Sequence, residues 1–180
     1  PRTKFLEHQK MFLNNQQNKK KHPNENFARE VMELFTLGRG NYSETDVKEA
    51  ARAFTGYRAR ADGFFRLDPR HQDQREKTLF GATGRFSGDD VIDLAYRQPA
   101  AATFLPREMA RFYLSDAALP PEHLAALGET WRSNGFELRA LVRQFFGSRL
   151  FYAPEFRGNF IKSPVHFYLA LIQDLGLDVA

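Results

Sequence analysis

Two amphipathic helical patterns follow one another between residues 23 and 57, separated by a short turn that contains two glycines. In each pattern, apolar residues recur at the spacing that places them on one side of an α-helix. Gly38 and Gly56 follow the last apolar residues, at the position where a left-handed backbone conformation commonly ends a helix. Two such helices form an antiparallel helical hairpin, which must bury its apolar faces against further elements. The predicted apolar faces are Phe27, Val31, Leu34 and Phe35 in the first helix and Val47, Ala50, Ala51 and Phe54 in the second.

The residues that precede these helices are typical helix caps. Asn24 or Asn26 can accept a hydrogen bond from the free backbone amides of the first helix. Ser43 opens the second helix, and Asp46 stands three residues later, in an arrangement that resembles a capping box.

The rest of the chain continues mainly in helical patterns. Ser87 with Asp90 predicts a helix start, Pro99 and Pro121 are typical first helical residues, and Ser163-Pro164 combines both signals. We expect Pro106 to kink the helix that Pro99 begins, because proline removes one backbone hydrogen bond. The apolar residues expected to face the core are Val91, Ile92, Leu94 and Ala95; Ala101, Leu105, Met109, Phe112 and Tyr113; Leu124, Leu127 and Trp131; Leu138, Leu141, Val142, Phe145 and Phe146; and Val165, Tyr168, Leu169 and Ile172.

One segment departs from the helical spacing. Residues 57–67 alternate around Asp62-Gly63, a dipeptide suited to the tight turn of a β-hairpin. Residues 68–90 are predicted to be a long polar connection. The sequence therefore predicts an all-α fold, a multi-helix orthogonal bundle with one small β-hairpin.

Charge and composition divide the chain into two parts. Residues 1–22 hold six Lys or Arg and one Glu, a net charge of +5, and the whole chain carries +4, so the other 158 residues carry −1. We expect residues 1–22 to be a basic polar segment, the remnant of a longer chain, with a short helix over residues 4–13. Residues 23–180 are expected to form a helical domain. A nearly neutral domain does not favour nucleic-acid binding. The chain has no Cys, which excludes disulfides and thiolate chemistry, and no apolar run of about 18 residues that could span a membrane.

A polar edge flanks the apolar face of the first helix. Asn26, Glu30 and Glu33 follow one another at helical spacing, and Arg29 is placed to pair with Glu33. Two carboxylates on adjacent turns can bind a hard cation or share a proton. The alternative is that they pair with arginines of neighbouring helices, of which Arg107 and Arg111 are the natural candidates.

His71 and Asp73 form the one His-x-Asp pair of the chain. Such a pair can act as a general base or as half of a metal site, although no second His stands at helical spacing. Gly81, Gly84 and Gly88 match neither of the glycine-rich phosphate-binding motifs.

The aromatic segment over residues 148–162 has two interpretations. Phe151, Tyr152, Phe156 and Phe160 alternate with basic residues, as in surfaces on which nucleic-acid bases stack. Core packing beneath a loop is the favoured interpretation, because the domain is nearly neutral.

Four segments resemble a large bacterial family known as domain of unknown function 1800. They are NENFAREVMELFTLGRGNYSETDVKEAARAFTGY, EKTLFGATGRFSGDDVID, RQPAAATFLPREMARFYL and FYAPEFRGNFIKSPVHF, and they occur in family order over nearly the whole chain. The resemblance implies a mostly helical protein, often exported to the periplasm or beyond, of which this chain is the C-terminal part. Gln98-Pro99 stands where family members commonly have His-Pro, and Tyr57 stands where Trp is usual.

Two functional interpretations follow, and no motif indicates a cofactor or a reaction. In the first, the domain is an exported binding or scaffold module that contacts a protein partner or the missing N-terminal part of its own chain. Asn26, Arg29, Glu30, Glu33, Arg52, Arg107 and Arg111 then form a buried structural network. In the second, it is a hydrolase-like or metal-dependent enzyme that uses Glu30 or Glu33, with the loop of His71 as a lid.

Overall fold

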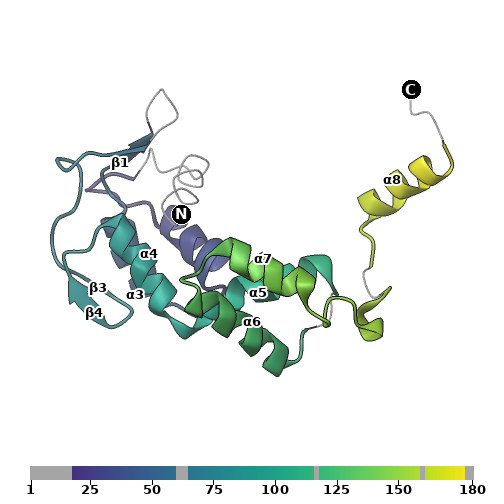
Figure 1. Cartoon of the computed structure of the whole chain (residues 1–180). Coiled ribbons are helices and arrows are strands. Elements are labelled where there is room, and N and C mark those ends of the chain that lie inside the picture. Colours follow the sequence, from purple (N-terminus) through teal and green to yellow (C-terminus); the bar gives the residue numbers. More distant parts are fainter. Residues whose placement is uncertain (1–17, 60–64, 116–117, 159–160, 177–180) are drawn as a thin grey trace.

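The computed structural model describes residues 18–59, 65–115, 118–158 and 161–176 (Figure 1). The expected fold class is confirmed: the chain is mostly helical, and its strands form two small antiparallel hairpins. The helices are α2 (Glu25–Glu30), the π-helical turn η2 (Val31–Thr36), α3 (Glu44–Ala53), α4 (Gly88–Arg97), α5 (Pro99–Tyr113), α6 (Pro121–Ser133), α7 (Leu138–Gly147), the 3-10 helix η3 (Pro154–Phe156) and α8 (Pro164–Asp174). The strands are β1 (Tyr57–Ala59), β2 (Phe65–Leu67), β3 (Lys77–Leu79) and β4 (Ala82–Gly84).

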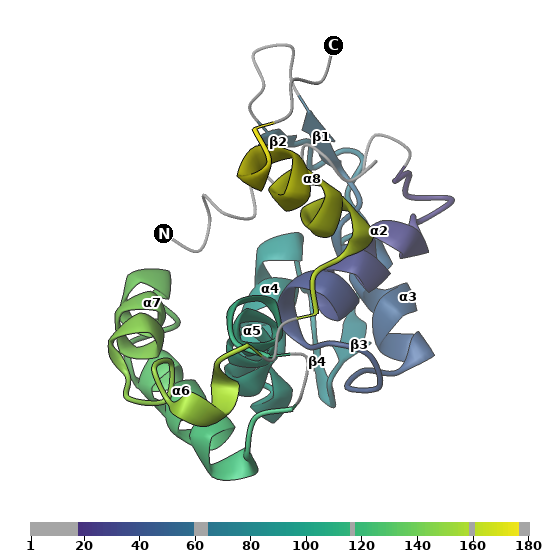
Figure 2. The same cartoon turned by 90° about the vertical axis from the view of Figure 1, so that its right-hand side faces the viewer.

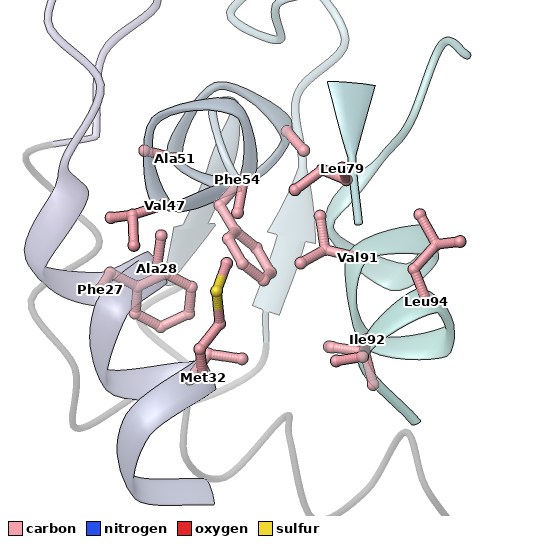
Figure 3. Packing of buried hydrophobic residues seen from close by; sticks show 14 of the residues in the cluster. Phe27, Ala28, Met32, Val47, Ala51, Phe54, Leu79, Val91, Ile92 and Leu94 are labelled. Carbon is pink, nitrogen blue, oxygen red and sulfur yellow. The ribbon is translucent and has the colours of Figure 1, made fainter. Parts of the chain in front are cut away.

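The N-terminal part of the core is built around the fully buried ring of Phe54. Phe54 directly follows α3, and its ring projects between Met32 of η2 and Val91 of α4, with Leu79 of β3 nearby (Figure 3). Phe27 of α2 meets Phe54 edge to face, with ring centroids 4.8 Å apart. The predicted apolar faces of α3 and α4 are confirmed, since each of their expected core residues is buried.

A second cluster joins α5, α6, α7 and the segment up to Phe156. Tyr96 and Phe136 pack against both clusters, and their rings lie 4.8 Å apart. At the crossing of α5 and α6, a Cβ on Gly128 would stand 2.8 Å from the carbonyl oxygen of Ala102, so glycine allows the two helices to approach closely. Leu127 and Trp131 of α6 are buried as expected.

The cap predictions are confirmed. Asn24 caps α2 by accepting from the amide of Asn26. Ser43 and Asp46 form a complete capping box, and Ser87 and Asp90 form another. Such pairs satisfy donors that a helix start otherwise leaves free, which fixes where these helices begin.

The apolar face of the first helix is predicted only in part. Phe27 and Val31 are buried, whereas Leu34 is 54% exposed. The reason is the π-helical turn, in which the amide of Leu37 donates to the carbonyl of Met32, five residues back, at 2.8 Å. The wider turn advances the buried face by one residue, so that Met32, Thr36 and Leu37 occupy the core in place of Leu34 and Phe35.

The predicted hairpin is confirmed: β1 pairs with β2, Tyr57 opposite Leu67. Its turn, residues 60–64, lies outside the described residues, as does the predicted helix over 4–13.

The prediction of a long connection over 68–90 is wrong in its second half, because β3 and β4 form another hairpin. Phe80 and Gly81 make its turn, with φ angles of 49° and 80°. Positive φ at both central residues is typical of the type I′ turn, but phenylalanine rarely adopts it.

Several apolar side chains that were expected in the core are exposed instead. Phe112 and Tyr113 of α5 are 66% and 51% exposed, and Leu138 of α7 is 51% exposed. No residue of α8 is buried. In Figure 1 α8 stands apart from the other helices, and in Figure 2, viewed from that side, it lies in front of them. None of the described helices combines the length and the apolar character that crossing a membrane requires.

Candidate functional site

The π-helical turn holds Glu33 against two donors of the following segment. Arg39 Nε donates to its Oε1 at 2.6 Å, and the Tyr42 hydroxyl donates to its Oε2 at 3.1 Å. The Arg39 hydrogen bond lowers the pKa of Glu33, so the carboxylate is held ionised. Burial and the bond to Glu33 raise the pKa of Tyr42, which keeps its hydroxyl a donor. Glu33 therefore closes the turn that follows η2.

Arg29 does not form the predicted ion pair with Glu33. Its guanidinium instead donates two hydrogen bonds to Glu44, at 2.7 and 2.6 Å, and so joins α2 to the first turn of α3. A forked pair of this kind fixes orientation as well as charge.

The predicted buried network of seven residues does not form as one unit. Asn26 and Arg107 are exposed, and Glu30 is partly buried and makes no ion pair with a described residue. Arg111 lies 3.6 Å from Glu108 on its own helix, so neither arginine of α5 pairs with Glu30 or Glu33. The polar edge of the first helix is thus divided among separate contacts.

His71 is paired with a different aspartate from the one predicted. Its Nδ1 lies 2.8 Å from Oδ2 of Asp68, and both side chains are partly exposed. Asp73 points to other partners and is fully buried. Nowhere in the described part of the chain do three His, Asp or Glu side chains meet as metal ligands would.

Asp73 is the centre of a buried charged cluster between α3 and the chain that precedes β3. Its carboxylate accepts from Arg52 Nε at 3.0 Å and from Arg75 Nη2 at 2.5 Å. Its backbone amide donates to the Thr55 hydroxyl at 2.7 Å. The Arg75 and Arg52 hydrogen bonds hold the pKa of Asp73 well below its usual range, against the effect of burial.

Lys77 completes this cluster and is 1% exposed. Its ammonium donates to the carbonyls of Asp73 and Arg75 at 2.6 and 2.8 Å, while burial lowers its pKa. Glu49 accepts from Arg52 Nη1 at 2.6 Å. Among the residues of this cluster, only Arg52 and Asp73 were candidates from the sequence. The i, i+3 spacing of Glu49 and Arg52 could also have predicted their ion pair. Because the carboxylate of Asp73 and the ammonium of Lys77 are buried and hydrogen-bonded within the protein, this cluster anchors a loop.

A surface of exposed aromatic side chains lies on α5, α7 and the segment that follows α7. Phe112, Tyr113, Phe146, Phe151 and Tyr152 form an aromatic strip in which each ring contacts the next, with centroids 4.7, 5.2, 4.9 and 5.3 Å apart. Its first two residues and its last are more than half exposed. The core packing expected for the aromatic segment holds for Phe151 and Phe156, which pack on the second cluster; Tyr152 is 61% exposed, and Phe160 lies outside the described residues.

A shallow hollow, lined by residues of α5, continues this strip along one side of that helix. It has a volume of about 520 Å³ and is open to solvent. Arg111 and Glu108 supply its polar groups. Its lining, called the α5 groove below, is Leu105, Glu108, Met109, Arg111, Phe112 and Tyr113.

Comparison with known proteins identifies the family. A family model described as "Protein of unknown function (DUF1800)" matches residues 7–179. The chain belongs to the DUF1800 family. The expected resemblance is therefore confirmed across nearly the whole chain. No curated protein and no solved structure matches this DUF1800 chain.

Proposed function

We propose that this DUF1800 domain is a protein-binding module that receives an apolar helix in the α5 groove. The single observation that carries the proposal is the exposed aromatic strip together with the groove that continues it. An apolar surface of this kind with a polar margin is the usual composition of a protein interface. Aromatic residues and arginine contribute most to binding at such surfaces, and both are present.

The shape of the groove favours a helix over other ligands. Leu105, Phe112 and Tyr113 stand at i, i+7 and i+8 of α5, on one face parallel to the helix axis, and Met109 between them is buried in the second cluster at the base of that face. A second helix packs naturally along such a face, as in the helix-in-groove complexes of many binding proteins. Arg111 and Glu108 at the margin can fix the direction of the incoming helix.

Export is part of the same proposal and rests on the family resemblance. We propose that the protein is bacterial and acts in the periplasm or outside the cell. Fractionation of cells that produce the protein from its own gene tests this, and recovery only in the cytoplasm would contradict it.

Site-specific photo-crosslinking tests the binding surface. A photoreactive amino acid replaces Phe112 in the protein produced by its native cells, and the same amino acid replaces Leu34 in a control. Leu34 is exposed and apolar and belongs to the π-helical turn, and it is not among the residues that line the α5 groove. We expect crosslinks to a polypeptide from position 112 and not from position 34. Equal, low crosslinking at both positions would overturn the proposal.

A further inference from the structure

We propose that the helix received by the α5 groove is α8 of a second copy of this chain, so that two copies exchange their last helices. This inference rests on the proposed function and names the partner of the same surface.

The composition of α8 requires a partner. Ile161, just before the helix, is 80% exposed, and the helix and the residue after it expose large apolar side chains on several faces. A helix that is apolar on most of its surface is stable in water only when other groups cover it. These side chains are Val165, Phe167, Tyr168, Leu169, Leu171 and Leu175, each at least 41% exposed.

The sizes of helix and groove agree. α8 has 11 residues, a length of about 16 Å. The groove residues from Leu105 to Tyr113 extend over about 12 Å of α5, and the aromatic strip prolongs this surface toward Tyr152. A half-exposed side chain of this size presents on the order of 100 Å². With about three such side chains on each side, two reciprocal contacts bury on the order of 1,200 Å², the area at which stable interfaces begin.

The charges agree as well. From Pro164 to Asp174, α8 contains one carboxylate, Asp174 in its last turn, and no Lys or Arg. The carbonyls of a helix C-terminus add partial negative charge to that end. On α5, Arg111 lines the groove beside Glu108, with which it forms an ion pair at 3.6 Å, and Arg107 is exposed one turn before Arg111 and adds a second positive charge. The acidic end of α8 therefore has a basic counterpart beside the groove.

The position of α8 favours exchange between two copies. α8 stands apart from the other helices (Figure 1), and Ser163, which precedes it, has an extended backbone conformation. Among the residues that the structure describes, one copy therefore presents both an open groove and an uncovered helix. Reciprocal exchange about a two-fold axis covers both surfaces in both copies.

Disulfide trapping tests this directly, because the chain has no Cys of its own. Phe112→Cys and Leu169→Cys are made in separate chains, mixed and oxidised under mild conditions. We expect a disulfide-linked heterodimer. In the control, a chain with Leu34→Cys takes the place of the chain with Phe112→Cys. The side chain of Leu34 is 54% exposed, as is that of Leu169, and we expect this control to give little disulfide-linked heterodimer.

Sedimentation measurements complete the test on the chain without Cys. We expect a concentration-dependent dimer, whose dissociation constant Phe112→Gln and Leu169→Gln each raise at least about tenfold, while Leu34→Gln leaves it unchanged. A protein that remains monomeric at all concentrations would overturn the exchange. A chain that carries both Phe112→Cys and Leu169→Cys gives a further check, because a disulfide that forms only within one such chain, and not between two chains, would also overturn it. If position 112 nevertheless crosslinks to a different protein in cells, the binding function stands and only the exchange fails.

Discussion

The guanidinium of Arg52 on α3 lies 3.0 Å from the carboxylate of Asp73, a fully buried residue 21 positions later in the chain. The pair connects the helical hairpin to the loop that leads into β3. Arg75 donates to the same carboxylate, and Lys77 donates to the carbonyls around it. A loop with few apolar side chains is thereby held against α3 by charged hydrogen bonds.

Replacing Asp73 by Asn should destabilise the fold. The amide has the shape of the carboxylate but lacks its charge, so Arg52 loses part of a buried ion pair. We expect Asp73→Asn to lower the free energy of unfolding by about 3 kcal/mol, measured by denaturant titration at neutral pH. His71→Asn serves as the control, because the His71 side chain is 53% exposed, and it should change stability by less than about 0.5 kcal/mol. Equal effects of the two substitutions would refute the role of the cluster.

The same pair predicts the dependence of stability on pH. The pKa of Asp73 is lower in the folded protein than in the unfolded chain, where it is about 3.9. Its stabilising contribution is therefore complete above that value and decreases as the pH falls below it toward the folded pKa. We expect the difference in unfolding free energy between the native chain and Asp73→Asn to be constant near neutral pH and to shrink below about pH 4. A difference that grows in acid would contradict the assignment.

Lys77 offers an independent test of how the loop is held. Lys77→Met keeps the length and apolar stem of the side chain but leaves two buried carbonyls without their donor. We expect a loss of about 1 to 3 kcal/mol in unfolding free energy and faster hydrogen exchange in the segment before β3. Lys48→Met, on the exposed side of α3, should have little effect on either quantity.

The sequence predicted best those features that depend on contacts between residues close together in the chain. The capping boxes of Ser43 and Ser87 and the left-handed Gly38 and Gly135 end or begin helices through contacts within a few residues. The buried faces of α3 and α4 follow from regular helical spacing. These features correctly gave the fold class.

The errors occur where spacing or burial depends on distant residues. The π-helical turn has no signature in the order of its side chains, so a regular period placed Leu34 in the core. Phe80 adopts a left-handed conformation while its side chain packs on the first cluster and its amide donates to Asp46, a contact 34 residues away. The exposure of Phe112 and of α8 cannot be derived from periodicity, because an apolar face has the same pattern whether its partner is in the same chain or in another.

The π-helical turn gives a pair of contrasting substitutions. Met32→Ala removes a fully buried side chain and should lower the unfolding free energy by about 2 to 5 kcal/mol. Leu34→Ala removes a half-exposed one and should cost less than about 1 kcal/mol. Denaturant titration of both variants checks the register. A larger loss of stability for Leu34→Ala than for Met32→Ala would instead favour the regular α-helix that the sequence predicted.

The last prediction concerns the close contact between α4 and the ring at the centre of the core. A Cβ on Gly88 would lie 2.5 Å from Cδ1 of Phe54, whose ring is fully buried among core side chains. We expect Gly88→Ala to lower the unfolding free energy by about 1 to 3 kcal/mol through overpacking. Gly147→Ala is the matched control, because Gly147 ends α7 and a Cβ there meets no atom within 4 Å. That substitution should be neutral or stabilise the protein by up to about 1 kcal/mol, since alanine favours helix more than glycine does. A Cβ on Gly88 would also lie 2.8 Å from Cε2 of Tyr57. Because both substitutions add one methyl group to a helical glycine, the difference between their unfolding free energies measures the contact of α4 with these two rings, and equal values would show that α4 does not pack on them as described.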